Sequence, residues 1–243
     1  MSSVVSLSEP PSTLGSPVSS VASLSSARTI KRHEVFYFRI VVFQVGDTLF
    51  KVPRYGMPGN AAAFEALFSS SAEDNTAPGS DDDNPIRLDE DVTEFDFASL
   101  LKATYPPPGR TIDSVQLTTD EWIAVLKLAK KWHLAELEQT AIRNSESRIQ
   151  NMESVDKIIF AKKHGVARWL REAYGQIGRR RDLISAEEKA KLDMKTYVGL
   201  LELRDIIWER ATQRNGYWYD DNKHSVAFED VIDGIFGEEV KET

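Results

Sequence analysis

The stretch Phe38-Arg-Ile-Val-Val-Phe-Gln-Val-Gly-Asp-Thr-Leu-Phe-Lys-Val-Pro-Arg54 carries the strongest fold signal in this chain. Its side chains alternate between two faces, and aromatic and β-branched residues dominate, which is typical of a half-buried strand. Gly46-Asp47 supplies a turn, and residues 48–52 form a second short strand. Pro53 ends that strand because proline has no N–H to donate. The stretch therefore predicts a β-hairpin.

A polar turn and a small apolar helix, Phe64-Glu-Ala-Leu-Phe68, follow the hairpin. We expect Val41 or Phe43, together with Leu49 and Phe64, to be buried between the hairpin and the helices. Residues 85–88 are expected to add one short strand.

The chain after residue 90 has the pattern of successive helices. Asp91 or Thr93 can cap the first helix, which the prolines at 106–108 stop. Residues 118–121 and 185–188 match the capping box, and Gly165 suits a left-handed helix end. Apolar residues at helical spacing mark the successive helices: Phe95, Phe97, Leu100, Leu101 and Tyr105; Trp122, Val125, Leu126, Ala129 and Trp132; Leu134, Leu137, Ala141 and Ile142; Val155, Ile158 and Ile159; Val166, Trp169, Leu170, Ala173, Tyr174 and Ile177; Tyr197, Leu200, Leu201, Trp208 and Ala211; Phe228, Val231, Ile232, Ile235 and Phe236.

Composition narrows the classes of function. The 243 residues carry a net charge of −8, which argues against a nucleic-acid surface, since phosphates need clustered lysine and arginine. The absence of cysteine rules out disulfides and thiolate metal sites. No apolar run approaches the roughly 18 residues of a membrane span, and the N-terminus lacks a secretory signal. The expected location is cytoplasmic or nuclear.

Two segments lack the periodic apolar residues of a core. Residues 1–30 are rich in serine and nearly uncharged, so we expect a disordered tail. A mitochondrial transit peptide is the alternative, although Glu9 and the late first basic residue, Arg28, disfavour it. Residues 70–84, with Asp81-Asp-Asp83, are expected to form a flexible acidic loop.

No catalytic, cofactor-binding or metal site is predicted. The phosphate-binding, dinucleotide-binding and hydrolase motifs are missing, and no histidine spacing suits a metal. His224 lies near Asp220 and Asp221, where a solvated acidic turn is the simpler interpretation. The basic run 179–181 fits a helix end better than a phosphate patch or an import signal. The aromatic run 217–219 fits packing better than ligand stacking. The four histidines are His33, His133, His164 and His224.

The order of these pieces resembles the BTB/POZ family, in the form common in fungal proteins. The resemblance covers about residues 33–147. It rests on Leu49-Phe50-Lys51-Val52-Pro53-Arg54, Phe64-Glu-Ala-Leu-Phe68, Asn84-Pro-Ile-Arg-Leu88 with Glu94-Phe-Asp-Phe97 and Leu100-Leu-Lys-Ala-Thr-Tyr-Pro106, and Val125-Leu-Lys-Leu-Ala-Lys-Lys-Trp-His-Leu134 with residues 137–142. Pro53 and Ala61 depart from the histidine and serine common at these places. Homodimeric members also carry a helix and strand before the hairpin, and residues 1–30 offer no such helix.

The resemblance implies an α+β fold of the BTB/POZ type at 33–147, followed by an α-helical C-terminal extension at 150–243. It implies a non-enzymatic module that binds proteins, itself or a cullin. From charge, hydropathy and the missing motifs, no nucleic acid, membrane or cofactor is expected. A Cullin-3 ubiquitin-ligase substrate adaptor is one alternative, because residues 153–181 lie where such adaptors extend the domain. An enzyme of unknown type using the helical extension is the other. The expected binding regions are 95–105, 122–142 and the surroundings of Trp169.

Overall fold

The computed structural model describes residues 30–34, 36–54, 78–105, 116–215 and 229–241. The chain divides into two units, 1–37 and 38–243. In the described part of the first unit, the guanidinium of Arg32 lies over the ring of Tyr37, 4.9 Å from its centroid. The predicted tail, apart from Ile30, and the predicted helix with Phe64 lie outside the described residues.

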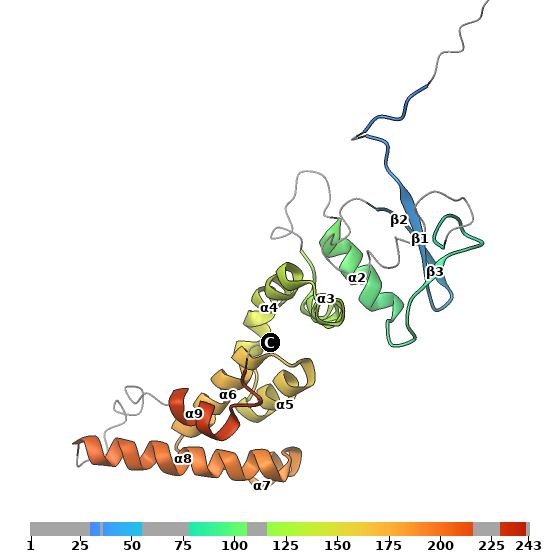
Figure 1. Cartoon of the computed structure of the whole chain (residues 1–243). Helices are drawn as coiled ribbons and strands as arrows, with labels where there is room; N and C mark the ends of the chain where they lie inside the picture. The colour runs from blue at the N-terminus through green and yellow to red at the C-terminus, as the bar shows by residue number, and fades with distance from the viewer. Residues whose placement is uncertain (1–29, 35, 55–77, 106–115, 216–228, 242–243) are drawn as a thin grey trace, which may run out of the picture. The chain divides into compact units, whose positions relative to one another are not determined.

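The predicted hairpin is confirmed in the second unit (Figure 1). Strand β1 (Ile40–Val45) pairs antiparallel with β2 (Thr48–Pro53), which ends at the proline as expected. Gly46 has a φ of 57°, a value that glycine adopts without strain in a two-residue turn. Strand β3 (Ile86–Arg87) lies parallel to β1, so the sheet has the order β2-β1-β3.

The register of the hairpin decides which side chains enter the core. Val41 and Phe43 are buried, as predicted, and Phe43 lies opposite Phe50. Leu49 is opposite Gln44 and 45% exposed, so the prediction that it is buried is wrong. Successive residues of a strand point to opposite faces, and Phe50 and Val52 are the residues of β2 that pack on the core.

Three helices pack in sequence beside this sheet. Helix α2 (Glu94–Thr104) contacts α3 (Thr119–Lys131), which contacts α4 (Ala135–Gln150). Thr93, not Asp91, caps α2, in a capping box with Asp96. The predicted capping box of Thr118 and Glu121 opens α3. Phe97 of α2 lies at the centre, with its ring edge-to-face to those of Phe43, Phe50 and Trp132.

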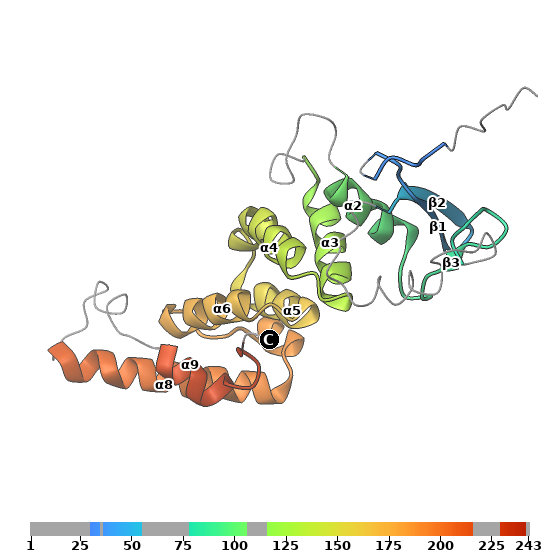
Figure 2. The ribbon, with the colours of Figure 1, turned by 45° about the horizontal axis from the view of Figure 1, so that its top comes forward.

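Five further helices follow: α5 (Ser154–His164), α6 (Ala167–Arg179), α7 (Ala186–Lys191), α8 (Met194–Asn215) and α9 (Glu229–Phe236) (Figure 2). Gly165 ends α5 with a φ of 62°, the left-handed conformation that was predicted. The stripe of α6 from Val166 to Ile177 is wholly buried against its neighbours. The described part of the chain is therefore a mixed α+β structure with three strands and eight helices.

Hydrogen bonds from two arginine side chains stabilise the connection between α6 and α8, residues 180–193. The buried guanidinium of Arg204 donates to the carbonyls of Asp182 (2.6 Å) and Arg181 (3.3 Å). Arg180 donates two hydrogen bonds to the carboxylate of Glu188, both of 2.7 Å. Glu188 also closes the predicted capping box with Ser185. Hydrogen bonding to Arg180 lowers the pKa of Glu188 to about 2.

This pKa predicts acid-dependent stability. Because the folded-state pKa of Glu188 lies below the unfolded value, its contribution is present above about pH 4.5 and is lost as the pH falls toward 2. Between these two pKa values, unfolding should take up most of one proton at this site. Urea denaturation between pH 5 and pH 2.5 should show a shallower pH dependence for Glu188→Gln than for the natural chain. Glu187→Gln is the control on the same helix, and equal effects of the two substitutions would contradict the assignment.

Candidate functional site

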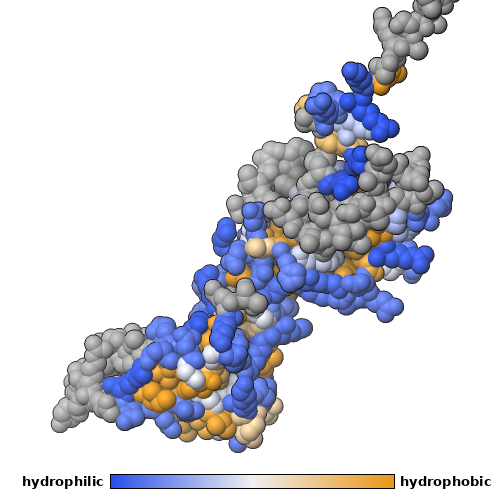
Figure 3. Space-filling view, in the orientation of Figure 1, coloured by the Kyte–Doolittle hydropathy of each residue, from blue (hydrophilic) through white to orange (hydrophobic). Residues whose placement is uncertain are grey.

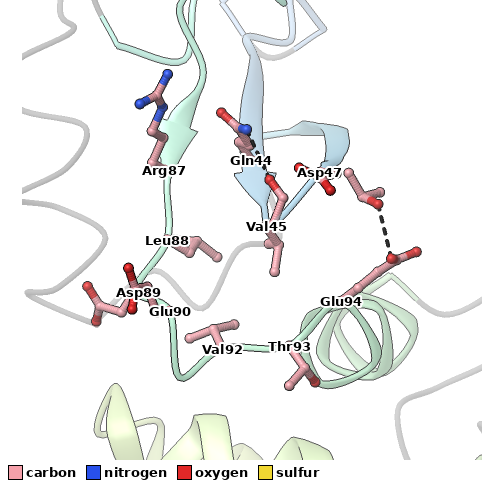
Figure 4. A pocket seen from close by; sticks show the side chains of 12 residues that line it. Gln44, Val45, Asp47, Arg87, Leu88, Asp89, Glu90, Val92, Thr93 and Glu94 are labelled. Carbon is pink, nitrogen blue, oxygen red and sulfur yellow. Dashed lines mark hydrogen bonds between the residues drawn. The ribbon is translucent and has the colours of Figure 1, made fainter.

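An open cleft of about 640 Å³ lies between the hairpin turn, the segment after β3 and the start of α2 (Figure 4). The hairpin turn brings Asp47 and Thr48 to one side of it, and the chain leaving β3 brings Asp89 and Glu90 to another. The hydroxyl of Thr48 donates to the carboxylate of Glu94 over 3.0 Å and joins the hairpin to α2. The residues that line the cleft are Gln44, Val45, Gly46, Asp47, Thr48, Arg87, Leu88, Asp89, Glu90, Val92, Thr93 and Glu94.

Carboxylates dominate this cleft, with Arg87 as the basic residue among its described lining. Lys131 of α3 forms ion pairs with Asp89 (2.8 Å) and Asp91, which tie the loop before α2 to α3. Hydrogen bonding to Lys131 lowers the pKa of Asp91. In turn, hydrogen bonds to Asp89 and, to a smaller extent, Asp91 raise the pKa of Lys131. The excess of negative charge favours basic segments over anionic ligands at this cleft.

The three predicted binding regions differ in what they expose. On α2, Phe95 is 53% exposed, whereas Phe97 and Leu100 are buried. Between residues 122 and 142 the large apolar side chains are buried or half-buried. Trp169 is fully buried in the core, so its side chain is not available to a partner in this arrangement. Of the three regions, α2 presents the most exposed large apolar side chain, since Ile159 of α5, next to the Phe160 that packs on Trp169, is 39% exposed.

Helix α8 carries an exposed apolar stripe, of which the sequence analysis named Leu201 but not Met194 or Val198. Met194, Val198 and Leu201 are 67%, 53% and 39% exposed. Their spacing of four and three residues places them on one face of the helix, and this spacing was the available signal. In Figure 3, hydrophobic surface gathers in the lower part of the view, where Figure 1 shows α8 and α9. An exposed stripe of this kind is typical of a surface that meets another protein.

The basic run and the histidines do not assemble into a site among the described residues. Arg180 is engaged by Glu188, and the carbonyl of Arg181 accepts from Arg204. His164 packs on Phe160, with ring centroids 4.4 Å apart, and burial lowers its pKa. No group of three or more potential metal ligands occurs in the described part of the chain. The residues considered at 217–221 and His224 lie outside it.

Across the described helices, none combines the length and apolar character needed to cross a bilayer. Comparisons of the chain with protein-family models, with curated proteins and with solved structures found no match.

Proposed function

We propose that this chain is a non-enzymatic protein-interaction module of the BTB/POZ type, with its domain at 33–147 and a helical extension at 150–243. The observation that carries the proposal is the order of the packed elements. A hairpin, a third strand beside β1, the helix α2 and the helical pair α3–α4 occur in the order that the family motifs predict. The module acts by associating with itself or with another protein, in the cytoplasm or the nucleus.

Exposed apolar side chains on separate helices support an interaction role. Phe95 stands at the start of α2 beside the acidic cleft, and Met194, Val198 and Leu201 form the stripe on α8. Each of these side chains exposes apolar area to water. A partner that covers this area gains about 25 cal/mol of binding free energy per Å². The carboxylates of the cleft complement a basic rim on the partner.

A Cullin-3 ubiquitin-ligase adaptor is the more specific form of this proposal. Helices α5 and α6 follow α4 directly and pack on each other through the stripe that includes Trp169. This helical pair occupies the place at which the resemblance implies the cullin contact is completed. The exposed Phe95 lies in the first of the regions that cullin-binding relatives use.

An enzyme that uses the helical extension is the competing proposal. The described crevices of the extension are open ones beside α9, lined in one case by Glu202, Arg210 and Asp230. Arg210 and Asp230 form an ion pair of 2.8 Å there. This arrangement supports a structural role for these charges over acid–base chemistry.

Replacing Phe95 by alanine is expected to weaken partner binding by about tenfold or more, since exposed aromatic anchors dominate interfaces. Light scattering of the full chain and titration with a recombinant Cullin-3 N-terminal domain would measure self-association and cullin binding. Leu183→Ala is the matched control, because Leu183 is 81% exposed but lies between α6 and α7. A monomeric chain that binds neither the cullin nor any other protein would refute the interaction function and favour the enzyme.

A further inference from the structure

An acidic segment after α8 packs against other helices of the same chain. This C-terminal segment, residues 229–240, comprises α9 and the turn after it, and it contacts α6 and α8 (Figure 2). Its apolar side chains Val231, Ile232, Phe236 and Val240 are buried. The residues 216–228, between α8 and α9, lie outside the described part of the chain.

The receiving surface has a place shaped for Phe236. The ring of Phe236 stacks on that of Tyr174 in α6, with centroids 4.0 Å apart and an interplanar angle of 18°. Gly199 of α8 lies beneath it, because a Cβ at this position would come within 2.8 Å of the Phe236 ring. We call this surface the α6–α8 groove, defined by Arg171, Tyr174, Gly199 and Arg210.

Basic residues around the groove form ion pairs with three acidic residues of the segment. Arg210 of α8 pairs with Asp230 over 2.8 Å, and Arg171 of α6 pairs with Asp233 over 2.7 Å. Lys162 of α5 approaches Glu239 to 3.1 Å. Arg171 also donates to the carbonyl of Val240, and Tyr174 donates to Glu239 over 2.7 Å. The groove therefore selects an amphipathic segment with an acidic polar face.

The C-terminal segment has two features that lower its stability as a helix. Helix α9 has eight residues, too few to be stable without its contacts. Gly234 lies within it although a Cβ there would meet nothing within 4 Å, so the glycine lowers helix stability without relieving any crowding. A crevice of about 480 Å³ also remains between α8 and α9, with Ile206 and Ile235 in its lining.

We propose that the α6–α8 groove is a binding site for an acidic amphipathic helix of a partner protein, and that the C-terminal segment is its releasable occupant. A partner helix with an ordinary residue in place of Gly234 forms the same ion pairs and loses less on becoming helical. It displaces the segment once its concentration, multiplied by this roughly fivefold advantage, exceeds the effective concentration of the tethered segment. This inference names a partner class for the interaction function proposed above and rests on it.

The test uses a fluorescent peptide of residues 229–241 carrying Gly234→Ala, titrated with the full chain by anisotropy. The segment within the chain competes with this probe. A chain with Gly234→Ala should therefore bind the probe about fivefold more weakly, because its own helix is more stable. A chain with Asp233→Arg should bind it about fivefold more tightly, because its own segment then meets Arg171 with like charge.

Charge reversal in the probe supplies the specificity control. A probe with Asp233→Arg should bind the natural chain more weakly and regain affinity for a chain with Arg171→Asp. Equal affinity of all chains for the probe, or no anisotropy change with any chain, would overturn the inference. Light scattering that shows the chain itself dimerising by exchange of this segment would also overturn it, by assigning the groove to a second copy. Neither result depends on Phe95, so the test of the proposed function remains separate.

Discussion

Replacing Phe97 by alanine should lower the free energy of unfolding by about 3–5 kcal/mol, the largest effect that we expect from one substitution where α2 packs on the sheet. The Phe97 side chain is fully buried. Its ring meets Phe50 at 5.1 Å, Phe43 at 5.3 Å and Trp132 at 6.3 Å between centroids. Truncation leaves a cavity where the two strands, α2 and the end of α3 converge, because rigid aromatic neighbours collapse only partly into the vacated space.

Urea denaturation followed by tryptophan fluorescence and circular dichroism would measure this loss. Phe95→Ala is the matched control, since it removes the same side chain two residues earlier on α2 at a position that is 53% exposed. Its effect should remain within about 0.5 kcal/mol. Similar losses for the two variants would show that the packing around Phe97 is not as described.

Replacing Glu172 by alanine should also cost about 3–5 kcal/mol, the range for removing the counter-ion of a buried charge. Lys157 of α5 is fully buried, and its ammonium lies 2.8 Å from the Glu172 carboxylate on α6. Gln176 holds the same carboxylate oxygen over 3.2 Å and accepts from Ser154. Removal of Glu172 leaves the positive charge of Lys157 in the core without its counter-ion, and an uncompensated buried charge is strongly destabilising.

Lys157→Met gives the asymmetric comparison. Methionine keeps an unbranched apolar side chain of similar length, and the remaining Glu172 side chain is 34% exposed and reaches water. The loss should therefore be below about 1.5 kcal/mol. Measured by the same urea titrations, a larger loss for Lys157→Met than for Glu172→Ala would contradict the burial of the ammonium.

Features that depend on neighbours in the chain could be predicted from the sequence. The capping boxes at Thr118 and Ser185 each need a hydroxyl and a carboxylate three residues apart, and both formed. Gly165 adopts the left-handed conformation that its place after α5 indicated. The hairpin followed from strand alternation and a two-residue turn, because both signals lie within sixteen residues of each other.

Features that depend on distant partners were decided by the tertiary structure. Leu49 and Phe50 are both apolar, and only their pairing with Gln44 and Phe43 places one outside and the other on the core. Lys157 becomes a buried charge because α6 brings Glu172 to it.

The candidate surfaces show the same division. Spacing grouped Trp169 and Tyr174 on one face of α6, but only the packing of the helices buries that face. The groove that receives Phe236 exists because α6 supplies Tyr174 and α8 supplies Gly199. Local hydrogen bonding and side-chain alternation therefore determined the elements of this protein, whereas contacts between residues far apart in the chain determined which apolar and charged groups are left for a partner.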